Sequence, residues 1–276
     1  MAFDNFTPEN GVVLLGCGKM GMALLQGWLR AGLNGRAVEV IDPTPTQTLL
    51  DMARQHGFAV ADESSRTTAK VVVIAVKPQQ LASAVPSVTH LATPETVILS
   101  VVAGTFMAWF EQKFAATTPV IRAMPNTPAA IGAGISALIC NAAASTAHLA
   151  LAESMMAAVG KTVLLENEAQ MDAVTGVSGS GPAYVFHMVE ALTAAGEREG
   201  LPTHLAAQLA RATVAGAGGL LAQTNETAAQ LRANVTSPNG TTFAGLQPLM
   251  DTESGLTQLM TKTVAAAANR SRELRG

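Results

Sequence analysis

The first half of the chain contains short apolar runs that alternate with segments of helical spacing. The runs are rich in valine and isoleucine and carry almost no polar residues. Strands of this kind are buried on both faces, which is typical of a parallel sheet covered by helices. We therefore expect an α/β fold with a doubly wound parallel sheet, as in a Rossmann domain. The runs are Val12–Leu15, Val38–Ile41, Val71–Val76, Val97–Val102 and Val120–Ala123, with Ile135–Cys140 as a candidate final strand.

After about residue 145 the strand pattern almost disappears. Only Thr162–Leu165 is expected to be extended, and the remaining sequence is rich in alanine and leucine at helical spacing. Gly200-Leu201-Pro202 and Ser237–Gly240 are strong breaks between helices. We expect an α/β domain over residues 1–160 and an all-α domain over residues 161–276. The expected helical segments are 168–199, 203–223, 227–235, 241–250 and 256–274.

A cluster of small residues lies inside the first of these helical segments. Each glycine there costs the helix about 1 kcal/mol relative to alanine. Close approach of another helix or of a ligand is the expected compensation. The cluster consists of Gly176, Ser178, Gly179, Ser180 and Gly181.

Charge and composition argue against several partners. The 276 residues include 17 Lys and Arg against 20 Asp and Glu, and only 4% are aromatic. No positive field or set of stacking rings would attract nucleic acid. Hydrophobic residues make up 49% of the chain, but prolines and glycines interrupt its longest uncharged stretch, 123–152, so we expect no membrane association.

The start of the chain and its cysteines add two further expectations. Residues 1–10 lack a basic start followed by an apolar stretch, so no secretory signal is expected. Cys17 and Cys140 form neither a disulfide framework nor a metal-ligand pattern. We expect a cytoplasmic, metal-free protein that uses its apolar excess in an oligomeric core.

A G-x-G-x-x-G motif follows the first apolar run and opens a helix. In this position the first glycine makes a tight turn, the second lets the backbone approach a pyrophosphate, and the third lets helix meet strand. The helix N-terminus then offers free N–H groups to the anion. The alternative is a purely structural turn, and the absence of a following Lys-Ser/Thr disfavours ATP. The predicted cofactor-binding residues here are Gly16, Cys17, Gly18, Lys19, Met20 and Gly21.

Asp42 ends the second apolar run, 21 residues after Gly21. An acidic side chain at this position can accept hydrogen bonds from the adenosine ribose and repels a 2′-phosphate. No Lys or Arg lies between Asp42 and Arg54 to hold that phosphate. These residues favour NADH over NADPH as cofactor. The alternative is that Asp42 is a turn or capping residue before Pro43.

The ends of the later strands should lie at the same edge of the sheet, where open α/β sheets bind ligands. Lys77 could place a catalytic cation near the nicotinamide, or it could be a solvated charge. Asn126 lies in a stiff loop between two prolines. The further cofactor contacts expected at this edge are Ala75, Val76, Lys77, Pro78, Ala103, Gly104 and Asn126.

The usual acid–base groups of dehydrogenases are missing from the sequence. Tyr184, the only tyrosine, is followed four residues later by Met188, so no Tyr-x-x-x-Lys pair exists. The five histidines are scattered, and Cys17 is expected to be a small filler. A substrate that needs little help with proton transfer, such as an imine, fits this lack better than a ketone.

Several motifs together resemble the pyrroline-5-carboxylate reductase family. They are the glycine loop, VKP (76–78), VVAG (101–104), RAMPNTP (122–128), SGSGPAYVF (178–186) and NVTSPNGTT (234–242). The resemblance implies reduction of 1-pyrroline-5-carboxylate to L-proline with NADPH or NADH, the last step of proline biosynthesis. It also implies a Rossmann domain followed by a helical domain that interlocks with that of a second chain. Such dimers commonly assemble into decamers, with each active site between the two chains.

The resemblance assigns roles to the loop that precedes the segment 241–250. Thr242 corresponds to the threonine whose hydroxyl approaches the ring nitrogen of the substrate, and it is the second predicted catalytic residue beside Lys77. Ser237, Gly240 and Thr241 correspond, with Thr242, to residues that bind the substrate carboxylate. Helix capping is the alternative for Ser237 and Thr242. Asn239 replaces a glycine of the family pattern, and asparagine tolerates the left-handed backbone conformation that the turn needs.

Two other functions remain open from the sequence. A β-hydroxyacid dehydrogenase has a similar glycine loop but needs a catalytic lysine in its helical half. Lys161 and Lys262 are the only lysines after residue 160, and neither lies in a convincing motif. A catalytically silent dinucleotide sensor or scaffold is the alternative from another class, and substrate turnover separates it from the enzyme.

Overall fold

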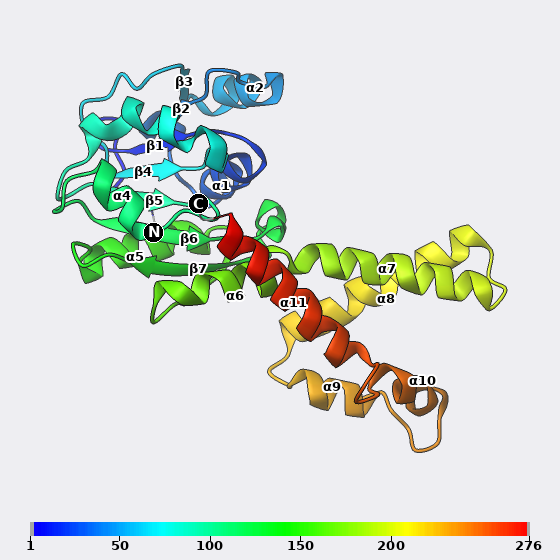
Figure 1. Cartoon of the computed structure of the whole chain (residues 1–276). Coiled ribbons are helices and arrows are strands. Elements are labelled where there is room, and N and C mark those ends of the chain that lie inside the picture. Colours follow the sequence, from blue (N-terminus) through cyan, green and yellow to red (C-terminus); the bar gives the residue numbers. More distant parts are fainter. Residues whose placement is uncertain (1–2, 275–276) are drawn as a thin grey trace. The chain divides into compact units, whose positions relative to one another are not determined.

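The computed structural model describes residues 3–274 and contains two compact units (Figure 1). The first unit runs to Gly179 and includes the chain again from Ala267 onward, and the second comprises Ser180–Ala266. The first unit is built around a sheet and the second consists of helices. The sheet continues through residues 160–164, so the compact first unit reaches beyond residue 160, where the sequence analysis places the domain boundary.

Eight strands form one sheet in the order β3-β2-β1-β4-β5-β6-β7-β8. The first strand, β1, lies between β2 and β4, so the strand order reverses there and creates the switch point at which α/β sheets bind ligands. The expected α/β fold is confirmed. The strands are β1 Val12–Leu15, β2 Val38–Ile41, β3 Ala59–Ala61, β4 Val71–Ile74, β5 Val97–Ser100, β6 Val120–Met124, β7 Gly134–Cys140 and β8 Gly160–Leu164.

One strand departs from the expected parallel arrangement. β7 pairs with β6 in antiparallel register, with Met124 opposite Ala137, while the other neighbouring pairs are parallel. A parallel crossover takes about a dozen residues or more. Residues 125–133 are too few for one, so the chain turns back directly into β7.

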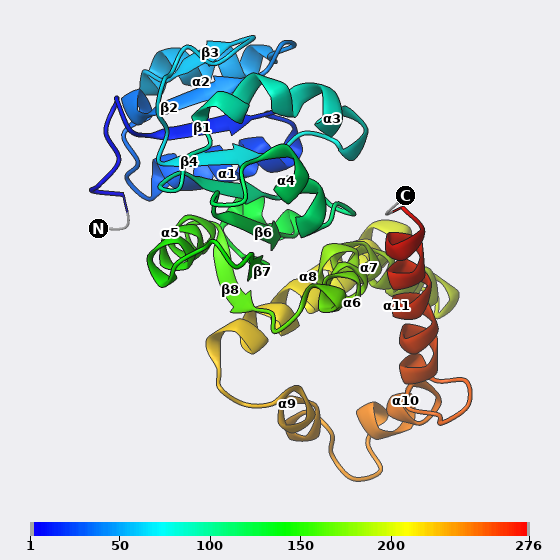
Figure 2. The same ribbon diagram turned by 60° about the vertical axis from the view of Figure 1, so that its left-hand side comes forward.

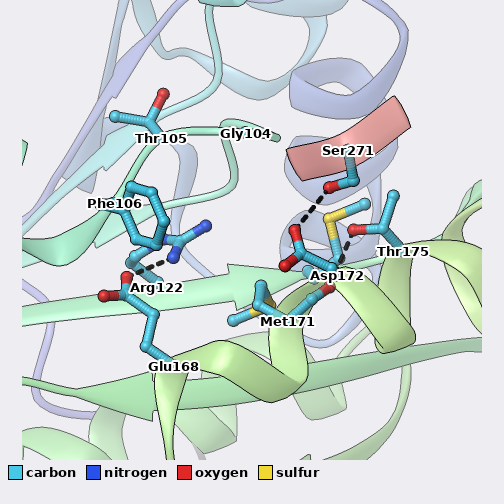
Figure 3. Close-up of a pocket in the computed structure, with 10 residues that line it drawn as sticks. Gly104, Thr105, Phe106, Arg122, Glu168, Met171, Asp172, Thr175 and Ser271 are labelled. Carbon is cyan, nitrogen blue, oxygen red and sulfur yellow. Dashed lines mark hydrogen bonds and ion pairs between the residues drawn. The ribbon is translucent and has the colours of Figure 1, made fainter. Parts of the chain in front are cut away.

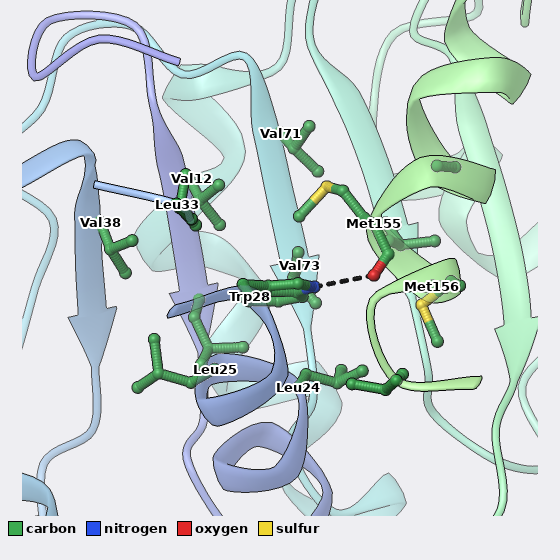
Figure 4. Packing of buried hydrophobic residues seen from close by; sticks show 14 of the residues in the cluster. Val12, Leu24, Leu25, Trp28, Leu33, Val38, Val71, Val73, Met155 and Met156 are labelled. Carbon is green, nitrogen blue, oxygen red and sulfur yellow. Dashed lines mark hydrogen bonds between the residues drawn. The ribbon is translucent and has the colours of Figure 1, made fainter. Parts of the chain in front are cut away.

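Two hydrophobic cores cover the two faces of the sheet. On one face Leu24, Leu25 and Trp28 pack with Met155 and its neighbours, and the Trp28 indole donates to the Met155 carbonyl at 3.0 Å (Figure 4). Burial of each such side chain stabilises the fold by about 1.5–3 kcal/mol. The helices that supply this face are α1 Lys19–Arg30, α2 Gln47–His56 and α5 Thr146–Ala157.

The opposite face is covered by shorter helices (Figure 2). Leu81 and Phe110 are their buried anchors, and they pack against Val72, Ile74 and Ile98 of the central strands. Both faces of β4 and β5 are therefore buried, as their uninterrupted aliphatic runs predict. The helices on this face are α3 Leu81–Ala84, which continues as a 3₁₀ segment Val85–Leu91, and α4 Met107–Lys113.

The connection to the second unit contains a π-helical turn. The expected helical segment 168–199 is divided into a 3₁₀ turn Glu168–Gln170, α6 Met171–Val174, the π turn Thr175–Gly179 and α7 Gly181–Arg198. A Cβ atom on Gly179 would lie 2.8 Å from Met124 Cε. Gly179 thus leaves room for a side chain of β6, while the expected approach of another helix or of a ligand to the small-residue cluster stays a prediction.

The second unit consists of helices with many exposed apolar side chains. α7 and α8 pack against each other, and α11 begins in this unit and ends in the first. The other helices are α8 Thr203–Gln223, α9 Ala228–Asn234, α10 Thr241–Leu249 and α11 Leu256–Glu273. Exposed large apolar side chains in this unit include Val185, Phe186, Leu192, Leu209, Leu220, Leu221, Phe243 and Leu259.

α8 is the one helix of the described residues that has the length and hydropathy of a membrane span. Only 11% of its apolar window is buried within the chain. The helix also contains Arg211 in its interior.

Candidate functional site

The glycine loop connects β1 to α1 at the switch point of the sheet. Gly16 has φ +85°, and a Cβ there would lie 2.7 Å from Val76 Cγ1. A Cβ on Gly21 would lie 2.4 Å from the Gly16 carbonyl oxygen. Gly18 is exposed and has open space where a Cβ would project. Two glycines are thus required by the fold, while Gly18 leaves room for a ligand to approach the backbone.

The N-terminus of α1 has the electrostatic properties of an anion site. Gly18 is its N-cap residue, so no side chain caps the first N–H groups, and the first turn carries no acidic residue. Lys19 is exposed and adds a positive charge at the positive end of the helix dipole. A bound phosphate would satisfy both the free N–H groups and this charge. The loop therefore fits the pyrophosphate of a dinucleotide.

Asp42 links the glycine loop to the turn after β2. Its Oδ2 accepts the main-chain N–H of Cys17 at 3.0 Å, and its Oδ1 accepts the N–H of Thr44 at 3.0 Å. Asp42 therefore does stabilise the turn after β2, as the structural alternative for this residue predicts. Each carboxylate oxygen has two lone pairs, so these bonds leave acceptor capacity for a ribose hydroxyl.

Cys17 lies buried beneath the same loop. Burial, and secondarily the charge of Asp42, raises the pKa of its thiol from 9.0 to about 12. The thiol is therefore uncharged at physiological pH and is not a nucleophile, since only the thiolate reacts. This agrees with its expected role as a small filler.

The ends of β4 and β5 lie at the same edge of the sheet as the glycine loop, because β4 pairs in parallel with β1 and β5 pairs in parallel with β4. Ala75 and Val76 are half-buried after β4, whereas Lys77 and Pro78 are exposed. Ala103 is exposed after β5, and Gly104 has φ +73°. Within residues 3–274 the Lys77 ammonium makes no ion pair. It is available to a ligand, and its catalytic role stays a prediction.

Asn126 has structural partners that the sequence did not reveal. Its Oδ1 accepts the N–H of Ile135 at 3.0 Å, and its Nδ2 donates to the Ser178 carbonyl at 3.4 Å. The side chain therefore joins the loop after β6 to the π turn. Its expected contact with the cofactor stays a prediction, and any such contact would have to use the remaining capacity of the amide.

A small pocket lies at the carboxyl end of β5 (Figure 3). Its volume of about 10 Å³ is the space that one water molecule needs. The Arg122 guanidinium on β6 donates to Glu168, whose Oε1 also accepts the N–H of Met107 at 2.6 Å. Asp172 and Ser271 form a second polar pair on the wall of this pocket. Sequence reasoning missed both pairs, because their members lie far apart in the chain.

The predicted substrate loop lies in the second unit, before α10. Gly240 is the N-cap, and a Cβ there would lie 2.3 Å from Ser237 Oγ, so a larger residue would require the Ser237 side chain to move. Asn239 has φ +58°, which confirms that asparagine adopts the left-handed conformation in place of the family's glycine. α10 has no side-chain cap. The helix-capping alternative for Ser237 and Thr242 is therefore not what the structure shows.

Three hydroxyl groups are exposed around this uncapped helix end. They belong to Ser237, Thr241 and Thr242, and within residues 3–274 they make no hydrogen bond. Together with the first N–H groups of α10 they form a small polar surface. Such a surface can bind a carboxylate through N–H groups and present a hydroxyl to a polar atom of the same ligand.

Comparisons with known proteins agree with this arrangement. Residues 168–274 match the family described as pyrroline-5-carboxylate reductase dimerisation, and residues 11–104 match the family of NADP oxidoreductases described as coenzyme F420-dependent. A pyrroline-5-carboxylate reductase of Pseudomonas aeruginosa is 37% identical over 97% of both chains.

Solved structures are similar along the whole chain. That of a pyrroline-5-carboxylate reductase from Coxiella burnetii has a TM-score of 0.89 and 31% identity, and the match covers 97% of this chain and 99% of that one. That of the Plasmodium falciparum enzyme with NADP bound has a TM-score of 0.81 at 23% identity, covering 99% and 100%. The second likeness shows the shared fold.

Proposed function

Because the chain belongs to the pyrroline-5-carboxylate reductase family, we propose that it reduces the C=N bond of 1-pyrroline-5-carboxylate with a nicotinamide cofactor and forms L-proline, the last step of proline biosynthesis. The observation that carries this proposal is the pair of complementary sites: a glycine loop that fits a pyrophosphate and an uncapped α10 N-terminus with free hydroxyl groups. The first fits the cofactor, and the second fits a small substrate with one carboxylate and one ring nitrogen.

The nicotinamide, when bound, supplies a hydride to the imine carbon. The glycine loop binds the pyrophosphate through the N–H groups at the start of α1. The N–H groups of Thr241 and Thr242, with Ser237 and Gly240, bind the substrate carboxylate. The Thr242 hydroxyl bonds to the ring nitrogen and orients it. A threonine hydroxyl is too weak an acid to be the proton source, so water or prior protonation of the imine supplies the proton.

The protein's main contribution to rate is then alignment of donor and acceptor. Holding two reactants in a reactive geometry can supply about 7–11 kcal/mol of the barrier. No strong acid is needed, which suits the absence of a titratable side chain among Ser237, Gly240, Thr241 and Thr242. Lys77, exposed at the end of β4, is proposed as a nearby cation that interacts with the cofactor or the substrate carboxylate.

NADH is proposed as the preferred cofactor. Asp42 places a negative charge at the end of β2, where a 2′-phosphate would have to bind. Arg54 is the first basic residue after it, and its guanidinium pairs with Asp51 at 3.0 Å on α2. The carboxylate of Asp42 retains acceptor capacity for ribose hydroxyls.

The family match to a dimerisation domain indicates a homo-oligomer. We propose that exposed apolar residues of α7 and α8, such as Phe186, Leu209 and Leu220, are covered by a second chain, and that the dimer is interlocked and assembles into a decamer. The hydropathy of α8 then reflects this interface. The resemblance also places each active site between two chains. A cytoplasmic location stays a prediction from the sequence.

The test is steady-state oxidation of NADH and of NADPH with 1-pyrroline-5-carboxylate as acceptor, with proline identified by mass spectrometry. Proline formed in proportion to cofactor oxidised, with the higher kcat/KM for NADH, is the expected result. A preference for NADPH would overturn the role of Asp42 in selectivity but keep the reductase. A folded protein that binds dinucleotide and forms no proline would overturn the proposed activity.

A further inference from the structure

A buried carboxylate joins α6 to the end of α11. Asp172 is 4% exposed, and its Oδ1 accepts the hydroxyl of Ser271 at 2.8 Å (Figure 3). Ser271 is also buried, and Arg272 Nε lies 3.8 Å from Asp172 Oδ2. Hydrogen bonds to an ionised carboxylate are about twice as strong as neutral ones. Loss of either partner would leave a buried polar group with fewer hydrogen bonds, which is costly.

The pair lies where the chain leaves the first unit and where it returns. Asp172 precedes the departure after Gly179, and Ser271 follows the return at Ala267. The hydrogen bond thus ties together the two segments that connect the sheet-containing unit to residues 180–266. The partners are 99 positions apart in the sequence, and the chain between them includes the whole predicted substrate loop.

The end of α11 also lies against the turn after β5. A Cβ on Gly104 would be 3.7 Å from the Leu274 carbonyl oxygen, and Gly104 lines the same pocket as Asp172 and Ser271. This turn is at the carboxyl edge of the sheet, next to the proposed cofactor site. A shift of the helix end would therefore displace the turn at Gly104.

From this geometry, and resting on the proposed function, we propose that Asp172 is a positioning residue for the reduction. Through Ser271 it holds the last turn of α11 on the first unit, beside both the departing segment and the Gly104 turn. Neither side chain bonds to substrate or cofactor. Their effect is on the alignment of the hydride donor and acceptor, in which an error of 1 Å can cost about 100-fold in rate.

A positioning role and a merely structural role differ in what they change. Loss of fold stability alone would lower the amount of active protein without changing the kcat of the folded fraction. Loss of alignment lowers kcat and the single-turnover hydride rate, while the glycine loop, which does not touch the pair, keeps its affinity for NADH. Asp172→Ala also removes the contact with Arg272, so its loss should equal or exceed that of Ser271→Ala, and adding Ser271→Ala to it should cost little more.

The experiment compares Asp172→Ala, Ser271→Ala, the double variant and Ser271→Thr, which keeps the hydroxyl. Arg270→Ala is the matched control, since it removes an exposed ion pair with Glu273 from the same turn. Single-turnover rate, kcat and the Kd for NADH are measured, with hydrogen exchange of residues 267–274. We expect about a tenfold fall in kcat for both single variants and the double variant, a Kd for NADH changed less than twofold, and recovery in Ser271→Thr.

The proposal is overturned if kcat of the folded single variants equals that of the wild type, or if their Kd for NADH rises as much as kcat falls. Additive losses in the double variant would also contradict it. Should Asp172→Ala fail to fold, Ser271→Ala carries the same test. If the wild type itself forms no proline, the proposed function fails. Hydrogen exchange of residues 267–274 that is faster in Ser271→Ala but not in Arg270→Ala would still show that the bond holds the end of α11.

Discussion

The main-chain N–H of Cys17 donates to Asp42 Oδ2 at 3.0 Å, across 25 residues of sequence. This bond fixes the glycine loop against the turn after β2. One carboxylate thereby stabilises the loop proposed to bind the pyrophosphate and faces the region proposed to bind the ribose. A substitution at Asp42 should accordingly change both the stability of the glycine loop and the selectivity for NADH over NADPH.

Asp42→Asn should shift cofactor selectivity toward NADPH. The amide keeps an oxygen that can accept an N–H but removes the charge that repels a 2′-phosphate. We expect the ratio of kcat/KM for NADH over NADPH to fall about tenfold, equivalent to about 1.4 kcal/mol. Glu111→Gln on the exposed surface of α4 removes the same charge away from β2 and should leave the ratio unchanged. Equal ratios in wild type and Asp42→Asn would contradict this role.

Gly16→Ala and Gly18→Ala should distinguish an effect on fold stability from an effect on dinucleotide affinity. Alanine at Gly16 meets Val76 and a φ of +85°, so it should cost about 1–3 kcal/mol of stability as well as dinucleotide affinity. Alanine at Gly18 meets nothing in the chain and should leave the melting temperature unchanged. Its methyl group projects from the proposed phosphate contact, so NADH affinity should fall. Calorimetry and NADH titration test both, and unchanged affinity in Gly18→Ala would place the dinucleotide elsewhere.

Thr242→Ala should lower turnover without weakening the cofactor complex. The exposed hydroxyl has no partner within residues 3–274, so its removal disturbs no internal bond. We expect kcat to fall about 100-fold through lost alignment, with the Kd for NADH unchanged and activity largely restored in Thr242→Ser. Thr261→Ala on α11, whose hydroxyl bonds to the Thr257 carbonyl, is the control and should behave as wild type. A kcat near the wild-type value in Thr242→Ala would remove Thr242 from the mechanism.

Cys17 should resist alkylation in the folded protein. Its pKa is raised from 9.0 to about 12, so almost no thiolate exists at pH 8. The folded state binds this proton more tightly than the unfolded state, and the resulting stability is complete below pH 9 and is lost as pH rises toward 12. Iodoacetamide labelling followed by mass spectrometry should modify Cys17 only after addition of urea. Rapid labelling of native protein at pH 8 would show that the thiol is neither buried nor neutral.

Local patterns predicted most of the secondary structure. The segment 203–223 coincides with α8 because Pro202 and the polar residues after Gln223 mark its ends. The strand β3 was not predicted, since Ala59–Ala61 is a three-residue edge strand without a β-branched run. β8 begins at Gly160, earlier than expected, because Gly160 pairs with Gly134 of β7, a contact that the local sequence does not reveal.

The site was predictable where its chemistry is local in sequence. The glycine loop and the turn at Asn239 are motifs in which spacing fixes backbone conformation. Ser178, Glu168 and Ser271 lie 46 to 99 positions from their respective partners Asn126, Arg122 and Asp172, and no periodicity relates them. Only the folded chain shows that Asn126 is already engaged and that Asp172 meets Ser271.

The most direct test of the central claim follows the hydride itself. The protein is supplied with NADH carrying deuterium at the transferable C4 position and with unlabelled 1-pyrroline-5-carboxylate, and the proline formed is analysed by NMR and mass spectrometry. The account predicts one deuterium, located at ring carbon C5, which was the imine carbon. Proline without deuterium, or cofactor oxidation without proline, would contradict hydride transfer to the C=N bond.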